Sequence, residues 1–285
     1  MDGYEYYKPR RLSEAIDMKK NCEGGRYIAG GTDMMVLIRD KRIKPKALIS
    51  LRNVEELHGK DKTWIGAGIT HRQLETDAYV RERFTALFNA VSVLGSTQIR
   101  CVATIGGNIV SARPAADTPP PLLSMGARFI LTGIGGEREI PADDFFVGVG
   151  KTVIRDDEIL AGIVIDELPP FTGTSYIKMA RRKAVDIAIV GVASRITLDK
   201  PDGVIKDAVV ILSSVGPKVM HAQAAEQALI GQKPGETLFE MAGAEAGRAC
   251  SPITDIRAAE WYRRAMVETL TKRTLREAHK RAAGV

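Results

Sequence analysis

Two glycine pairs, each next to hydroxyl or amide side chains, could together form a receptor for phosphate oxygens. The pairs are Gly30-Gly31 and Gly106-Gly107, and each follows a short apolar run. A glycine has no Cβ, so its backbone can approach a ligand closely and can adopt a positive φ without strain. Neighbouring side chains add further hydrogen-bond donors to the backbone amides. The sequence therefore predicts two loops that hold a diphosphate, and a third pair, Gly135-Gly136, that only turns a hairpin between alternating strands.

Four segments, in the same order along the chain, carry a resemblance to a known family. Residues 111–117 follow the second glycine pair, and the other three segments are residues 4–15, 176–188 and 251–255. Together with both glycine pairs they resemble the FAD-binding subunit of molybdenum hydroxylases, the medium-subunit family of xanthine dehydrogenase and carbon monoxide dehydrogenase. The resemblance covers nearly the whole chain.

The resemblance implies a fold of the α+β class with two domains. Residues 1–170 would form a two-lobed FAD-binding domain of the vanillyl-alcohol-oxidase-like (PCMH) type, with lobes at 1–55 and 56–170. Residues 171–285 would form a C-terminal domain like that of the carbon monoxide dehydrogenase flavoprotein, with an antiparallel sheet plus helices. The local patterns agree, because strands expected at 188–198 and 204–212 precede helices expected at 222–230, 236–250 and 256–281.

The elements expected around the glycine pairs would position them. A strand at 26–29, a helix from residue 32 to 38 and a strand at 46–50 suggest a parallel pair joined by a crossover helix. A helix is expected over residues 70–81 and another over 84–94. A further helix should start at Asp117, because a capping side chain there is followed by prolines in the first turn.

The residues expected to bind the cofactor come from both glycine pairs and from scattered positions that match the family. They are Ile28, Ala29, Gly30, Gly31, Thr32, Asp33, Met34, Leu94, Thr104, Ile105, Gly106, Gly107, Asn108, Ser111, Asp117, Leu160 and Lys178. The resemblance adds Ile187 as an apolar lid over the ring. No residue is expected to be catalytic or to bind a metal.

Several of these residues have two possible interpretations, one structural and one functional. Asp33 is expected to cap a helix rather than face a phosphate, because both groups are anionic. Asp117 is an N-cap by local chemistry and a cofactor contact by resemblance, and a carboxylate can do both. Lys178 is either an exposed charge on a strand or, as the family implies, a cation at the flavin. Leu94 stands where xanthine dehydrogenases stack a phenylalanine, so face-to-face stacking is not expected.

Composition narrows the function further. The chain has 285 residues, 45% apolar and 27% charged, and no apolar run of about 20 residues that could span a membrane. A cytoplasmic location follows, since no signal pattern opens the chain. The net charge of +6 is mild, and the basic residues near the end, from Lys272 to Arg281, are expected to be the solvated face of a helix rather than a nucleic-acid site.

Cysteines and histidines point to an organic redox cofactor. The three cysteines lie far apart and the four histidines lack metal-ligand spacing, so neither a disulfide framework nor an iron–sulfur cluster is expected. By resemblance, the chain binds FAD, receives electrons from the [2Fe–2S] clusters of a small subunit, and passes them to an external acceptor. A large subunit would hold the molybdenum cofactor in a dimer of heterotrimers of the xanthine dehydrogenase, carbon monoxide dehydrogenase or aromatic hydroxylase type. A stand-alone flavin reductase and a non-redox assembly module remain as alternatives.

Overall fold

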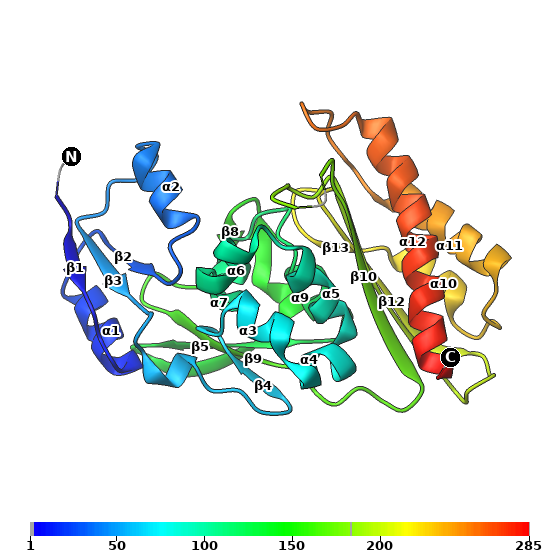
Figure 1. Ribbon diagram of the computed structural model, residues 1–285, viewed down its shortest axis with the longest axis horizontal. Helices are drawn as coiled ribbons and strands as arrows, with labels where there is room; N and C mark the ends of the chain where they lie inside the picture. Colours follow the sequence, from blue (N-terminus) through cyan, green and yellow to red (C-terminus); the bar gives the residue numbers. More distant parts are fainter. Residues whose placement is uncertain (1–2, 183, 285) are drawn as a thin grey trace.

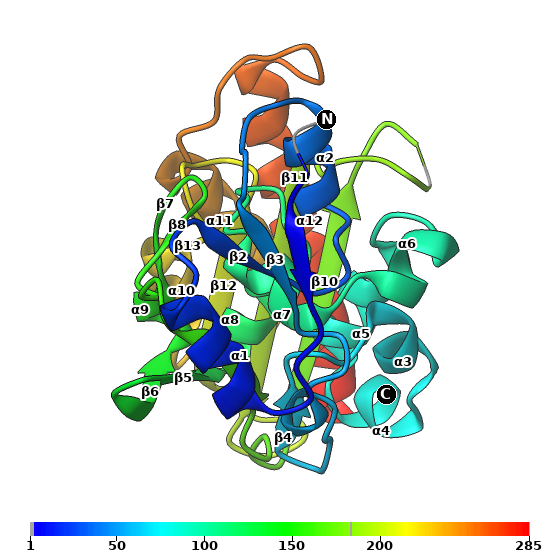
Figure 2. The same ribbon diagram turned by 90° about the vertical axis from the view of Figure 1, so that its left-hand side faces the viewer.

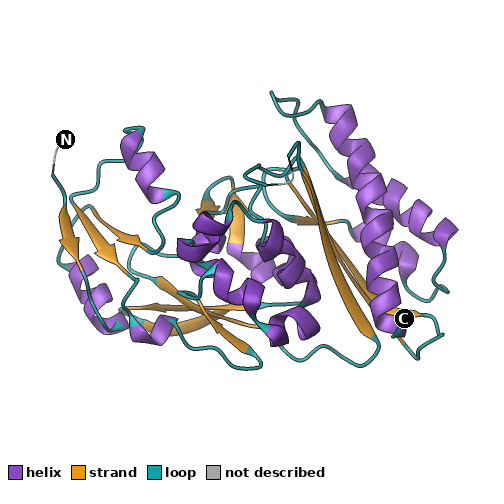
Figure 3. Ribbon diagram, viewed as in Figure 1, coloured by secondary structure: helices purple, strands orange, loops and turns teal. Residues whose placement is uncertain are grey.

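Three sheets of three or four strands follow one another along the chain (Figure 1). The structure is a computed structural model that describes residues 3–182 and 184–284. Strands and helices are segregated rather than strictly alternating (Figure 3), and this confirms the predicted α+β class. Within the described residues, no helix is both long enough and apolar enough to cross a membrane.

The first sheet holds the first glycine pair and lies in front of the other two in Figure 2. Its elements are β1 (Glu5–Tyr7), α1 (Leu12–Lys20), β2 (Gly25–Ile28), α2 (Met34–Arg39) and β3 (Ala47–Ser50). The strands run parallel in the order β1-β3-β2, and the chain passes from β2 to its neighbour β3 through α2. The predicted strand–helix–strand unit is therefore confirmed.

The second sheet is antiparallel. Its strands, in spatial order, are β4 (Trp64–Gly66), β9 (Ile159–Val164), β5 (Arg128–Gly133) and β6 (Gly136–Pro141). The hairpin predicted at the third glycine pair is confirmed, because Gly133 pairs with Gly136 across the turn. Gly136 has a φ of +100°, a value that a residue with a Cβ adopts only under strain.

Short helices and one small hairpin precede or connect the strands of the second sheet. They are η1 (Glu55–Leu57), α3 (His71–Thr76), α4 (Ala78–Arg83), α5 (Thr85–Val93), α6 (Thr97–Val102), α7 (Ile105–Val110), α8 (Pro119–Ser124), α9 (Ala142–Phe145), β7 (Phe146–Gly148) and β8 (Lys151–Thr152). The single helix predicted over residues 70–81 is wrong. Asp77 has an extended backbone, and its side chain accepts a hydrogen bond from the N–H of Val80, so one helix ends there and a second begins.

The third sheet is antiparallel and is followed by the last helices. The elements are β10 (Thr172–Met179), β11 (Val190–Leu198), β12 (Ile205–Ser213), β13 (Met220–His221), α10 (Gln223–Leu229), α11 (Glu236–Ala249) and α12 (Glu260–Ala283). The predicted order of strands before helices is confirmed. The last helix begins later than predicted, because Asp255 accepts hydrogen bonds from the N–H groups of Arg257 and Ala258 and holds that segment as a turn.

The third sheet belongs to two hydrophobic cores at once. Helix α12 covers one face (Figure 1), and α5 and α8 pack against the other. Side chains alternate between the faces of a strand, so Val192 and Leu212 join the core beneath the last helices. Their neighbours Ala193 and Ile211 join the core of the second sheet instead.

Candidate functional site

A cleft of about 1060 Å³ is lined by residues from all three parts of the fold. The predicted cofactor residues that line it are Ile28, Ala29, Gly30, Gly31, Thr32, Asp33, Met34, Leu94, Thr104, Gly106, Gly107, Asn108, Ser111, Asp117, Leu160 and Lys178. Ile187, the predicted lid, lines it too. Ile105 is the exception, since its side chain is fully buried and its amide donates to the carbonyl of Ile69. Ile105 therefore supports the cleft from behind rather than lining it.

The first glycine loop, residues 29–34, presents a row of unoccupied backbone donors to the cleft. None of the N–H groups of residues 30–34 donates to another residue in the described part of the chain. Gly31 has a φ of +73°. Gly30 packs so closely on the segment that precedes the second pair that an added Cβ would lie 2.0 Å from the carbonyl oxygen of Val102. Such a row of free donors suits an anion.

Asp33 does not play the part expected of it. It occupies the N-cap position of α2, but its side chain makes no capping hydrogen bond. The predicted cap is therefore wrong. Its backbone is already in the helical region, with φ −94° and ψ −46°, whereas a capping side chain normally needs an extended backbone to reach the amides of the first turn.

The second glycine segment, residues 104–108, differs from the loop that was predicted. Its glycines lie in the first turn of α7, and the Thr104 hydroxyl accepts a hydrogen bond of 3.1 Å from the N–H of Gly107. The N–H groups of Ile105 and Gly106 donate to carbonyls of residues 67–69 at 3.0 and 2.9 Å. These three amides are occupied, so the segment does not offer the predicted backbone cradle.

Side chains supply the donors of the second glycine segment instead. The Asn108 Oδ1 accepts hydrogen bonds from the Thr118 N–H and hydroxyl, which leaves its NH₂ group without a partner among the described residues. The Thr104 hydroxyl oxygen accepts a hydrogen bond from the Gly107 N–H, and this leaves its own O–H as a donor. The Ser111 hydroxyl donates to the Asn108 carbonyl and so steadies the same turn.

A buried ion pair lies at the end of the cleft formed by the third sheet. The Lys178 ammonium donates to Asp117 Oδ2 at 2.9 Å, and the Tyr176 hydroxyl donates to Asp117 Oδ1 at 2.9 Å. The two charged side chains are 6% and 7% exposed. Burial raises the pKa of Asp117, and the nearby Lys178 opposes that rise. Burial and the neighbouring carboxylate hold the pKa of Tyr176 well above its usual value.

This ion pair corrects two interpretations of the sequence. Asp117 is not an N-cap, because α8 starts at Pro119 and Thr118 occupies the capping position. The reading of Lys178 as an exposed charge is also wrong, since its ammonium lies inside, beside Asp117. Both errors have one cause: the partners are 61 positions apart in the sequence, so no local pattern connects them.

The other end of the cleft carries charges that sequence reasoning missed. Lys19 of α1 forms an ion pair with Asp156, and Arg26 of β2 lies 3.9 Å from the same carboxylate. Arg155 also lines this end. These pairs connect the first sheet to the loop before β9. Nothing in the local sequence signals them, because more than a hundred residues separate the partners.

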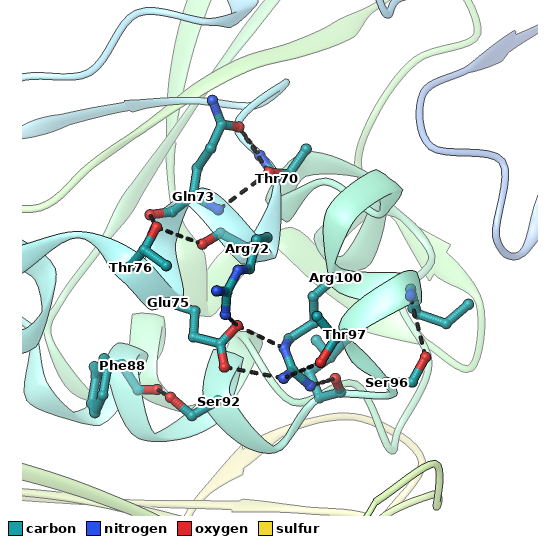
Figure 4. A network of polar contacts seen from close by, with 12 residues as sticks. Thr70, Arg72, Gln73, Glu75, Thr76, Phe88, Ser92, Ser96, Thr97 and Arg100 are labelled. Atoms are coloured by element: carbon teal, nitrogen blue, oxygen red, sulfur yellow. Dashed lines mark hydrogen bonds and ion pairs between the residues drawn. The ribbon is translucent and has the colours of Figure 1, made fainter.

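A polar network behind the cleft holds one of its walls (Figure 4). Arg100 of α6 binds Glu75 of α3 through two hydrogen bonds of 3.0 Å and donates a third, of 2.9 Å, to the Leu94 carbonyl. His71 lines the cleft nearby and is fully buried. Burial first, and then Arg100, lowers the pKa of His71 to about 4, so its ring is neutral at pH 7.

Metal-ligating side chains do not gather in this region. In residues 3–182 and 184–284, no group of three or more histidine, cysteine, aspartate or glutamate side chains is arranged to hold a metal ion. The cleft instead combines backbone donors, apolar walls and a buried ion pair, which suits an organic anion with a flat apolar part.

Comparison with known proteins gives two family matches and several full-length relatives. Residues 2–167 match the FAD-binding domain in molybdopterin dehydrogenase, and residues 175–278 match the carbon monoxide dehydrogenase flavoprotein C-terminal domain. The chain is 27% identical to the carbon monoxide dehydrogenase medium chain of Hydrogenophaga pseudoflava, over 98% of each chain. It is 30% identical to the nicotinate dehydrogenase FAD-subunit of Eubacterium barkeri, over 81% of each.

Solved structures agree with these matches. The carbon monoxide dehydrogenase of Hydrogenophaga pseudoflava that lacks the Mo-pyranopterin moiety superimposes with a TM-score of 0.92 and 29% identity, over 98% of both chains. The quinoline 2-oxidoreductase of Pseudomonas putida 86 gives a TM-score of 0.91 and 26% identity, over 99% of this chain and 98% of the other.

Proposed function

This chain belongs to the FAD-binding medium subunits of the molybdenum hydroxylases, with FAD as its cofactor, and we propose that it carries electrons from the [2Fe–2S] clusters of a partner subunit to an external acceptor. It is thus a subunit of an oxidoreductase, like its relatives. The molybdenum cofactor and the clusters lie on other subunits, and the chain's own task is to bind FAD and to set the surroundings of its ring.

The single observation that supports this task best is the row of free N–H groups in the first glycine loop. We infer that the diphosphate of FAD lies against residues 30–34, with the Thr104 hydroxyl and the Asn108 NH₂ group as donors on the opposite side. Backbone donors fixed in this way cost little entropy when an anion binds. The other residues predicted to bind the cofactor line the same cleft, except Ile105.

The isoalloxazine ring is placed at the end of the cleft that holds Leu94 and the Asp117–Lys178 pair. Leu94, Leu160 and Ile187 are among the apolar residues that line the cleft. When bound, FAD supplies a carrier that is stable after uptake of one electron or two. Asp117 offsets much of the charge of Lys178, since their charged atoms are 2.9 Å apart. The effect of Lys178 on the flavin would therefore be smaller than that of a lone buried cation.

Further features of the proposal come from the family and the sequence. The partners are a small iron–sulfur subunit and a large molybdenum subunit, arranged as a dimer of heterotrimers in the cytoplasm. The FAD-binding domain covers residues 1–170, with lobes at 1–55 and 56–170, and the C-terminal domain covers residues 171–285. The mass of the native complex tests the assembly directly, because a dimer of heterotrimers contains two copies of this chain.

Purified chain provides the first test. We expect one FAD per chain, released into solution by acid precipitation, because no cysteine, histidine or tyrosine stands in a recognisable flavin-attachment motif. A yellow pellet would contradict non-covalent binding. A chain that never takes up flavin would support the non-redox assembly module instead.

The assembled enzyme provides the second test. Removal of FAD should stop reduction of the physiological acceptor, while substrate oxidation continues with an artificial acceptor that takes electrons upstream of the flavin. Co-purification with iron- and molybdenum-containing chains is expected. A chain that reduces its own substrate without such partners would instead be a stand-alone flavin reductase.

A further inference from the structure

Three consecutive carbonyl groups beside the cleft, two of them in residues that line it, each accept a hydrogen bond from a different segment of the chain. The carbonyl of Val93 accepts from Lys178 Nζ of β10 at 3.4 Å, and that of Leu94 accepts from Arg100 Nη1 of α6 at 2.9 Å. The carbonyl of Gly95 accepts from the N–H of Val185 at 3.1 Å. Residues 93–95, which we name the 93–95 wall, thus join the FAD-binding part to the C-terminal domain.

Arg100 makes more hydrogen bonds than the other two donors. Its residue is only 9% exposed, and its Nε and Nη2 each bind one oxygen of Glu75 at 3.0 Å. A guanidinium is planar, so a two-point attachment to a carboxylate also sets the direction of its third nitrogen. That nitrogen donates to the Leu94 carbonyl, and Figure 4 shows the pairing of Glu75 with Arg100.

We propose that Arg100, held by Glu75, is a positioning residue that fixes the 93–95 wall against the isoalloxazine end of FAD. The proposal rests on the proposed placement of the ring beside Leu94. The wall begins at Val93, the last residue of α5, where helix carbonyls have no partner within the helix, and Gly95 has a φ of +53°. Without Arg100 the buried Leu94 carbonyl loses its partner, so the wall shifts to find another.

The proposed role predicts a loss that is confined to one end of the cofactor. Arg100 makes no hydrogen bond to residues 30–34, whose amides would hold the diphosphate; its partners among the described residues are Glu75, Leu94 and Thr97. ADP contains the diphosphate and adenosine of FAD but no isoalloxazine. Binding of ADP should therefore survive a change that moves only the 93–95 wall, whereas binding of FAD should weaken.

The experiment uses the full chain, freed of flavin, in the variants Arg100→Met, Arg100→Lys and Arg72→Met. Arg72 is a matched control, since it also pairs with Glu75 at 2.9 Å, yet its side chain is 46% exposed and it donates no hydrogen bond to the described wall residues. Titration calorimetry gives Kd for FAD and for ADP, and visible circular dichroism reports the surroundings of the bound ring. Thermal unfolding identifies any variant that does not fold.

Both Arg100 variants should weaken FAD binding about tenfold, leave ADP binding within about twofold and change the flavin dichroism, while Arg72→Met changes none of these. A lysine cannot bind both Glu75 oxygens and the Leu94 carbonyl at once, so Arg100→Lys should not restore FAD affinity. If Arg100→Met does not fold, the same measurements on Arg100→Lys and Glu75→Gln test the proposal. An unchanged ratio of the FAD and ADP constants in the folded variants, with unchanged dichroism, overturns the proposal.

Leu94→Ala separates this failure from failure of the ring placement. If Leu94→Ala alters the flavin dichroism and the Arg100 variants do not, the ring lies beside Leu94 and Arg100 has no positioning role. If neither change alters the dichroism, the ring does not lie beside Leu94, and both the placement and the positioning role are wrong.

Discussion

The first glycine loop and the second glycine segment share a sequence pattern but differ in what their amides do. In each pair, the first glycine is needed for close packing: a Cβ on Gly30 would lie 2.0 Å from the Val102 oxygen, and one on Gly106 would lie 2.7 Å from the Ala67 oxygen. The amides of residues 30–34 have no partner within the described part of the chain, whereas those of Ile105, Gly106 and Gly107 are occupied within the protein.

A glycine pair therefore predicts that its backbone comes close to another group. The hydrogen bonds of its amides show whether that group is a ligand or the protein itself. At the first loop both apply, because Gly30 meets Val102 while the amides after it stay open to the cleft. At the second segment the close neighbour is the protein, and ligand donors must come from side chains. Substitutions of single glycines can separate these roles.

Gly30→Ala should have the largest effect. The added methyl would clash with the backbone of Val102 and Ala103, and backbone atoms cannot move aside as a flexible side chain can. Overpacking of this kind costs about 1–3 kcal/mol, and here it pushes the first glycine loop away from the second segment. We expect FAD affinity to fall about tenfold or more by titration calorimetry. A variant that binds FAD normally would show that the two segments need not touch.

Gly31→Ala should have an intermediate effect. Its φ of +73° strains any residue with a Cβ by about 1 kcal/mol, although the nearest atom, the end of the Ile28 side chain, is 3.3 Å away and can adjust. The loop can relax this strain when empty and must restore it to bind, so FAD affinity should fall about fivefold. An unchanged Kd would mean that the amides after Gly31 do not hold the diphosphate.

Gly107→Ala should have a small effect, although its position in the sequence matches that of Gly31. Its backbone is helical, and an added Cβ would meet only the Thr104 hydroxyl, at 3.1 Å. Alanine favours a helix by up to about 1 kcal/mol over glycine, so the unfolding temperature should hold or rise. FAD affinity should stay within about twofold. A loss as large as that of Gly30→Ala would show that α7 amides do bind the cofactor.

Gly136→Ala should have the smallest effect on FAD and serves as the control for both pairs. Its φ of +100° makes alanine strained, so stability should fall by about 1 kcal/mol in urea unfolding. The turn between β5 and β6 does not line the cleft. Flavin content should equal that of the unaltered chain, and a loss of flavin would show that stability alone governs binding in all four variants.

Local signals in the sequence predicted the elements well. The family and its cofactor, predicted from the resemblance along the chain, are confirmed. The parallel unit around the first loop and the hairpin at Gly136 are confirmed too, and each is formed by consecutive segments of the chain. The capping role of Thr104 was also readable, since a threonine three residues before an amide is a frequent N-cap, but the glycines after it argued for a loop.

Contacts between distant segments could not be predicted in the same way. The pairing of Asp117 with Lys178 spans 61 positions, and that of Glu75 with Arg100 spans 25. In both cases the tertiary fold brings the two side chains together in the interior, and only that fold determines which partner each one has. The capping role given to Asp117 from its local sequence was wrong for that reason, because its carboxylate accepts a hydrogen bond from Lys178 on β10 and Thr118 occupies the capping position of α8.

The third sheet, with a core on each face, has a consequence for how the protein loses its structure. Ala193 and Ile211 contribute to one core and Val192 and Leu212 to the other, so neither core can open without exposing the back of the other. Two domains built in this way share one unfolding transition rather than melting in turn. A ligand that binds in the cleft would then raise the melting temperature of the last three helices, which it never touches.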